Sequence, residues 1–435
     1  MAERYDAIII GAGIIGACIG HALAKRGWRT LNLDRLPAAG YGPTASSCAI
    51  IRTHYSTLEG TAIAHEGWFT WKDWAGYLNA EDERGLAEYY DTGAMVLKTE
   101  LNGDLASIIG HIRELGIPYE EWDAETIKAR LPAYDLHQFG PVRRPDDPGF
   151  GEPAEAPVNG AVFFPRAGYV SDPQLASHNV QRAAEARGGA FRFNASVTAI
   201  RKAGGPDGGR VLGVTLADGS EIDAPVVVNV AGPHSAQINA LAGVLEEMTI
   251  ETKALRQEVT HVPAPEGFTL PYVTSDSDIG CYCRPEVGNH ILVGSEDPEC
   301  DEREWVDPDD YNTDFTEQWT VQAYRYAQRL PSLGIPSKMR GVVSLYDVSD
   351  DWIPIYDGSS LGGYYMAIGT SGNQFKNGPV AGEMMAELIE RCQAGHDHDA
   401  EPLRFHLQHT DRSIDVGFYS RKRTINPESS FSVLG

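Results

Sequence analysis

The sequence predicts an α/β fold with two domains, one built on a parallel sheet covered by helices and the other on an antiparallel sheet. Its 435 residues exceed the size that one hydrophobic core usually supports, so a second domain is expected. The chain opens with strand, glycine-rich turn, helix and strand, and a second strand–turn–helix segment follows at 363–392. Because both segments would serve one sheet, we expect each domain to be discontinuous in the sequence.

The N-terminal unit is the clearest element. Residues 6–10 (DAIII) form a short apolar run typical of a buried strand, residues 14–26 follow a helical pattern that ends at Gly27, and residues 30–33 form a second buried strand. The remaining helices are expected at 59–78, 105–115, 124–131, 175–188 and 380–392. The remaining strands are expected at 191–200, 211–216, 226–230 and 364–368, with a hairpin at 277–293.

The expected domains follow from these elements. The proline-, glycine- and acid-rich stretch 141–157 predicts a surface loop, and the polar stretch 393–435 predicts a C-terminal tail on the surface. The expected nucleotide domain comprises 1–92, 158–238 and 340–392, and the expected substrate domain comprises 93–157 and 239–339.

Composition excludes several classes of protein. The net charge of −25 disfavours nucleic acid and anionic membranes as partners. No segment reaches the roughly 20 apolar residues of a membrane span, and the N-terminus lacks the regions of a signal peptide, so we expect a cytoplasmic protein. The six cysteines have neither CxxC nor zinc-site spacing, so we expect free thiols and no metal.

The residues Gly11, Gly13 and Gly16 form a GxGxxG motif between the first strand and the first helix, and Asp34 closes the next strand. The first glycine allows a tight turn, the second allows close approach of a pyrophosphate, and the third allows close packing of helix and strand. The helix N-terminus stabilises the phosphates, and the carboxylate accepts ribose hydroxyls. The pattern predicts a Rossmann-type dinucleotide site.

The second strand–turn–helix segment favours FAD over NAD. It reads GYYMAIGTSGNQFKNGPVAG from Gly363 to Gly382 and returns to the first domain. A cofactor held at both ends between two domains needs such a return, whereas a single NAD site does not. We therefore expect an FAD-binding domain.

Four anchors in order resemble those of the D-amino-acid-oxidase-like flavoenzyme family, in its sarcosine oxidase and glycine oxidase branch. They are the N-terminal motif with its aspartate, SCAIIRTHY at 47–55, VVVNVAG at 226–232, and the segment 369–382. The resemblance covers nearly the whole chain, and the order of four anchors is far more specific than any one of them.

The resemblance implies that Arg52, in an IIRxxY run, and Lys376, in an SGxxFK run, bind a substrate carboxylate. The chemistry agrees, since an arginine clamps a carboxylate through paired hydrogen bonds and a lysine adds a point charge. His54, Tyr55, Tyr282 and Arg284 are further candidates for the substrate pocket. Besides the motif residues, the resemblance implies contacts to FAD from the following residues: Ile14, Ile15, Arg35, Ser46, Ser47, Val197, Ala231, Gly232, Gly369, Gly372, Asn373, Gln374, Phe375 and Lys376.

The sequence departs from the branch at several positions, among them Asn373 and Gln374, which replace a common Gly-His pair. Ser344 stands where relatives with covalent flavin have a cysteine, and Ala49 occupies the nearest N-terminal attachment position, so non-covalent FAD is expected. Leu292 stands near the place of the lysine that activates oxygen in those oxidases. The electron acceptor is therefore open, oxygen or another carrier, with a slow reaction with oxygen as the expectation.

The resulting hypothesis is FAD-dependent oxidation of a small anionic amine, such as a secondary or N-methyl amino acid, with hydride transfer to the flavin and an imine as product. One alternative is oxidation of a 2-hydroxy acid or polyol phosphate, whose anion the same two cations would bind. A second alternative is a flavin-binding subunit or assembly factor with little turnover. The sequence leaves the substrate side chain and the oligomeric state open.

Overall fold

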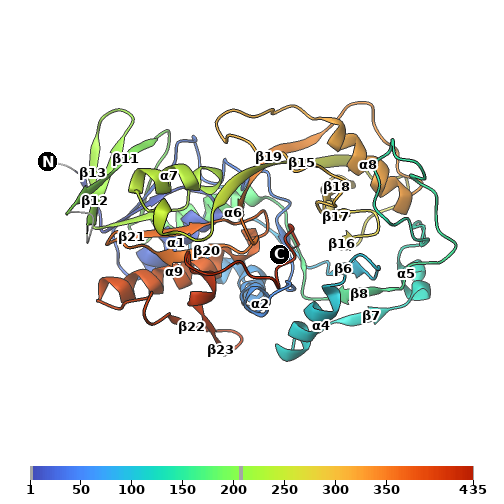
Figure 1. Ribbon diagram of the computed structural model, residues 1–435, viewed down its shortest axis with the longest axis horizontal. Helices are drawn as coiled ribbons and strands as arrows, with labels where there is room; N and C mark the ends of the chain where they lie inside the picture. Colours follow the sequence, from blue (N-terminus) through green and yellow to red (C-terminus); the bar gives the residue numbers. More distant parts are fainter. Residues whose placement is uncertain (1–2, 205–208, 435) are drawn as a thin grey trace.

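The computed structural model describes residues 3–204 and 209–434, and a six-stranded sheet organises one half of these residues (Figure 1). Its neighbouring strands are parallel except for the last pair, which is antiparallel. In spatial order the strands are β10 (Ala190–Arg192), β3 (Thr30–Leu33), β2 (Ala7–Ile10), β14 (Val226–Asn229), β21 (Tyr364–Ile368) and β20 (Ile355–Gly358). The N-terminal and C-terminal strands thus meet in one sheet, as the sequence predicts.

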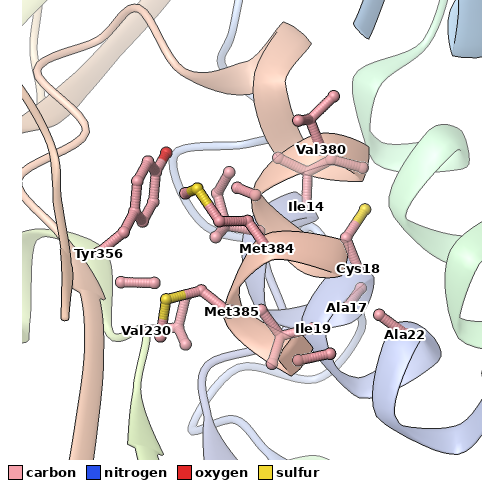
Figure 2. Packing of buried hydrophobic residues seen from close by; sticks show 14 of the residues in the cluster. Ile14, Ala17, Cys18, Ile19, Ala22, Val230, Tyr356, Val380, Met384 and Met385 are labelled. Carbon is pink, nitrogen blue, oxygen red and sulfur yellow. The ribbon is translucent and has the colours of Figure 1, made fainter. Parts of the chain in front are cut away.

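Helices cover this sheet. Helix α1 (Ile14–Lys25) packs between α6 (Pro173–Glu185) and α9 (Gly378–Gln393). Figure 2 shows Cys18 and Ile14 of α1 beside Val380 of α9, and Met384 of α9 extending toward Tyr356, within one buried apolar cluster. A Cβ at Gly382 would lie 2.7 Å from the Cys18 carbonyl oxygen, so glycine permits the close helix contact. Further helices are α2 (Leu58–Lys72), α3 (Trp74–Leu78) and α7 (Ser235–Ala242).

The other half is built on an eight-stranded sheet that is antiparallel except where β16 pairs with β6 (Figure 1). In spatial order its strands are β19 (Gly341–Ser349), β15 (Thr252–Pro263), β18 (His290–Ser295), β17 (Cys281–Glu286), β16 (Val273–Asp276), β6 (Ala94–Leu97), β8 (Ala161–Phe164) and β7 (Glu120–Trp122). Its helices are α4 (Leu105–Glu114), α5 (Ala124–Arg130) and α8 (Glu317–Arg329). The expected hairpin is β17–β18, and the α/β class with its antiparallel second sheet is confirmed.

Smaller sheets complete the fold. The strands β1 (Glu3–Arg4), β13 (Glu221–Asp223), β12 (Arg210–Leu216) and β11 (Val197–Ala203) form one sheet; β4 (Ile50–Ile51), β9 (Gly168–Val170) and β5 (Tyr89–Tyr90) form another; β22 (Arg404–Leu407) and β23 (Arg412–Asp415) form a hairpin. The domain boundaries expected at 158 and 340 assign β8 and β19 to the nucleotide domain. In the structure both strands pair within the eight-stranded sheet of the other half.

Two predicted elements are wrong in extent. The single helix expected at 59–78 is two helices, since Asp73 has a non-helical backbone and its carboxylate caps α3 at the Gly76 N–H. The single strand expected at 191–200 is two strands, β10 and β11, which lie in different sheets. Asn194 between them has a φ of +54°, which turns the chain from one sheet to the other.

The prediction of a polar surface tail at 393–435 is also wrong in part. The β22–β23 hairpin buries Phe405, Leu407 and Ile414 in the same apolar cluster as α1 and α9. Val433 is buried as well, in a separate apolar cluster. The overall composition of the stretch is polar because the buried side chains of the hairpin alternate with exposed residues along two short strands. No helix among residues 3–204 and 209–434 has the length and apolarity that crossing a bilayer requires.

Candidate functional site

The first glycine-rich turn is fixed by close backbone contacts. Gly11 has a φ of +122°, and a Cβ there would lie 2.2 Å from the Val230 carbonyl oxygen. A Cβ at Gly16 would lie 2.3 Å from the Gly11 carbonyl oxygen. Gly13 instead has ordinary dihedral angles, and a Cβ there would lie 3.0 Å from Thr44 Oγ1. The turn therefore requires glycine at Gly11 and Gly16 and is also tight at Gly13.

The N-terminus of α1 has the features of a phosphate site. Gly13 supplies no side-chain cap, and the first turn holds no acidic residue. Thr44 Oγ1 accepts a hydrogen bond from the Ile14 N–H (3.2 Å). Asp34 accepts from the N–H groups of Ala12 (2.8 Å) and Leu36 (2.9 Å), which leaves lone pairs for ribose hydroxyls, and burial raises its pKa. These residues fit a dinucleotide.

Two buried asparagines hold the turns in place, and the sequence prediction missed both. Asn32 Nδ2 donates to the carbonyls of Gly11 (3.1 Å) and Gly16 (2.9 Å). Asn229 donates to the Ser235 carbonyl (2.9 Å), and its Oδ1 accepts from the Ala231 N–H (3.1 Å). A polar residue inside an otherwise apolar buried strand was the available signal.

The other nucleotide-site candidates have different surroundings. Gly232 has a φ of +56° at the start of a short 3₁₀ helix after β14. Ser47 Oγ accepts from the Ala49 N–H (3.0 Å), and Ser46 lies beside it. Arg35 is instead partly exposed and forms an ion pair with Asp309 (2.5 Å). Ile14 and Ile15 lie in the buried first turn of α1, and Val197 is the first residue of β11.

The second glycine-rich turn is organised by Asp347, which the sequence prediction also missed. Its carboxylate accepts from the Gly369 N–H (2.7 Å) and Ser235 Oγ (3.2 Å), and its carbonyl accepts from the Ser371 N–H (2.7 Å). Complete burial raises the pKa of Asp347 to about 7. Gly372 has a φ of +71°, and a Cβ there would lie 2.5 Å from the Tyr346 ring.

Arg52 and Lys376 both contact Tyr55. Lys376 Nζ donates to Tyr55 Oη (2.8 Å) and to the Asn373 carbonyl (2.6 Å). The Arg52 guanidinium lies over the Tyr55 ring, 4.2 Å from its centre, and donates to the carbonyls of His54 and Val433, the latter at 3.1 Å. Residues separated by more than 300 positions in the sequence thus form one cluster.

The turn around Lys376 is rigidly held by its neighbours. Gln374 accepts hydrogen bonds from Tyr356 Oη (3.2 Å) and Asn377 Nδ2 (2.7 Å). The indole of Trp71 donates to the Lys376 carbonyl (2.8 Å) and stacks on Phe375, with ring centres 5.2 Å apart. These contacts fix the direction of the lysine side chain.

The cations of this cluster have no carboxylate in ion-pair contact within the described residues, although the charge of Glu296 acts on Arg52 at longer range and partly offsets the lowering of its pKa. Neither Arg52 nor Lys376 forms an ion pair with a carboxylate there, although both are buried. Desolvation lowers the pKa of both groups, and Arg52 lowers the pKa of Lys376 further. Burial of unpaired charge is costly, so two such cations at one place indicate an anion-binding site.

The remaining candidates for the substrate pocket have different environments. His54 stacks on Phe164 (ring centres 4.2 Å apart), and burial beside Arg52 and Lys376 lowers its pKa. Tyr282 Oη lies 3.6 Å from Cys48 Sγ in an apolar cluster. Arg284 forms an ion pair with Glu286 (2.8 Å), so its charge is already balanced.

A cavity of about 240 Å³ lies between the two halves of the molecule. One side is formed by 45–48 and 171–173, and the other by β15, β17, β18 and β19. Leu292 and Arg284 line it together with Ser46 and Ser47. Crevices between domains are common ligand sites, and this one adjoins nucleotide-site candidates.

The parallel sheet, its two glycine-rich turns and the cation cluster at its edge define a two-domain dinucleotide-binding enzyme. The model of the FAD dependent oxidoreductase (DAO) family matches residues 6–388. The chain belongs to this family, and FAD is its cofactor.

Relatives span almost its full length. The chain is 24% identical to a glycine oxidase from Geobacillus kaustophilus, covering 94% of this chain and 98% of that protein. It is also 24% identical to sarcosine oxidase subunit beta from Rhodobacter capsulatus, covering 95% and 92%. The structure resembles L-proline dehydrogenase from P. horikoshii, with a TM-score of 0.76 at 20% identity over 97% of this chain and 98% of that one. The last likeness supports the fold.

Proposed function

We propose that the protein oxidises a small amine that carries a carboxylate, such as a secondary or N-methyl amino acid. The observation that carries the proposal is the pair of buried cations, Arg52 and Lys376, that meet at Tyr55 without a carboxylate partner among the described residues. A substrate carboxylate supplies the missing negative charge. The relatives named glycine oxidase and sarcosine oxidase subunit beta support the amine class.

The residues of the cluster bind and orient the substrate. Arg52 offers a planar fork to the carboxylate, and Lys376, whose Nζ lies 4.9 Å from the centre of the Tyr55 ring, offers a point charge. Their positive charges disfavour a further cation nearby, so we propose that the amine binds in its neutral form. Bound FAD supplies the acceptor for the hydride of the carbon next to nitrogen, and the resulting imine hydrolyses in water.

Anaerobic reduction of the bound flavin tests this proposal. The purified protein is mixed with N-methyl, cyclic secondary and primary amino acids, with 2-hydroxy acids, and with the amides of the same amino acids. We expect bleaching of the flavin by at least one amino acid and much slower bleaching by its amide. Bleaching by hydroxy acids alone would replace amine oxidation with alcohol oxidation, and no bleaching by any compound would overturn an oxidative role.

We also propose that FAD is held without a covalent bond. Ser344, paired with Gln257 between β19 and β15, has a hydroxyl that forms no thioether, and Ala49 has no group for attachment. Acid precipitation is expected to release all yellow colour into the supernatant. Flavin that remains in the washed pellet contradicts this prediction.

A further inference from the structure

The segment 429–434 brings a backbone carbonyl to the proposed substrate cations. Arg52 donates one hydrogen bond to the Val433 carbonyl (3.1 Å), across 381 positions of sequence. The segment is anchored by two contacts just before Val433: the Ser430 N–H donates to Ser56 Oγ (3.2 Å), and Arg303 donates to the Phe431 carbonyl (2.7 Å). Val433 therefore lies beside Arg52 because several contacts hold the segment there.

The side chain of Val433 is buried in an apolar cluster next to the cations. Its buried neighbours in that cluster include Cys48, Val259 and Tyr282. Cys48 and Val259 also line the cavity between the two halves, as does Leu292, which packs against the same cluster. Val433 is thus connected to Arg52 through its backbone and to the cavity wall through its side chain.

We propose that segment 429–434 forms part of the wall of the substrate site and that Val433 limits the size of the substrate's side chain. The inference rests on the proposed function, since it assumes that Arg52 binds the substrate carboxylate. A group fixed at Arg52 places the remainder of a small substrate against whatever apolar surface adjoins the guanidinium. The Val433 side chain supplies part of that surface, and its carbonyl keeps Arg52 oriented.

Substitution of Val433 tests the proposal because the backbone carbonyl at Arg52 is retained. Val433→Ala removes two methyl groups, so kcat/KM for an amino acid with a larger side chain should rise relative to a small one by about tenfold or more, the lower end of the range that one methylene supplies. Val433→Phe should shift the ratio in the opposite direction. The neighbouring Leu434, which is half-buried and outside the cluster, provides the matched control Leu434→Ala.

The two proposals fail in different ways. If wild-type protein is reduced by no amino acid, the proposed function fails. If the wild type is active but Val433→Ala and Val433→Phe keep its ratio of large to small substrates, or change it no more than Leu434→Ala does, the wall proposal is overturned. Flavin content and thermal midpoint, measured for each variant, separate a change in selectivity from loss of fold, and the opposite shifts expected for Ala and Phe have no counterpart in simple destabilisation.

Discussion

The buried arginines of α8 and the buried cations at Tyr55 carry the same charge, but only the arginines of α8 are paired with carboxylates among the described residues. Arg329 contacts the carboxylates of Asp276 (2.7 Å) and Asp278 (3.0 Å), and Arg325, one turn earlier, forms two hydrogen bonds with Asp301. Arg52 and Lys376 contact only carbonyls, a hydroxyl and a ring among the described residues. The paired arginines stabilise the fold, whereas the proposed function predicts that the unpaired cations lower its stability and are retained for a substrate anion.

The largest expected effect lies on the paired side. Arg329→Met leaves Asp276 and Asp278 buried without a cation, which costs about 3–5 kcal/mol of folding free energy. We expect a marked fall in the thermal midpoint or in the yield of soluble protein. Arg52→Met, the matched change on the unpaired side, should leave stability equal or higher. An equal loss of folding stability in both variants would contradict the proposed difference between the two regions.

A second effect extends the comparison to carboxylates. Among residues 3–204 and 209–434, Asp34 accepts only from backbone N–H groups and no cation contacts it, so we expect its remaining lone pairs to bind FAD. Asp34→Ala should weaken FAD binding by roughly 1.5–3 kcal/mol for each lost hydrogen bond to the charged acceptor. The measurement is the dissociation constant of FAD after removal and titration. Asp218→Ala, an exposed control in a turn, should bind FAD as the wild type does, and full retention by Asp34→Ala would remove Asp34 from the site.

The depressed pKa of Lys376 predicts a smaller effect that depends on pH. The unfolded chain binds a proton on this lysine below about pH 10.4 that the folded chain releases at its lower pKa, so folding stability rises with pH within that window. Lys376→Met removes this dependence and should exceed the wild type in thermal midpoint most at pH 7 and least near pH 10. The exposed Lys253→Met is the control. A difference between Lys376→Met and wild type that stays constant with pH would contradict the lowered pKa.

The sequence predicts those parts of the site that local pattern specifies. Gly11, Gly16 and Asp34 follow a strand–turn–helix–strand order, and each has a local backbone reason for its identity. Arg52 and Lys376 were found because each lies in a short motif of a known family. Asp347 and Val433 escaped prediction, since their roles arise from contacts across more than 20 and more than 380 positions that leave no periodic signal. The break at Asp73 escaped because the aromatic pattern continues on both sides of it.

The most direct test of the central claim compares an acid with its amide in two proteins. If Arg52 binds the substrate carboxylate, Arg52→Lys keeps the charge but loses the paired hydrogen bonds, and kcat/KM for the acid should fall about tenfold or more, ~1.4 kcal/mol in the barrier. The amide, already a poor substrate, should be nearly indifferent to the substitution. Arg284→Lys, whose arginine is paired with Glu286, should affect acid and amide alike. If kcat/KM of Arg52→Lys falls as much for the amide as for the acid, the account is contradicted, and Arg52 does not recognise the substrate carboxylate.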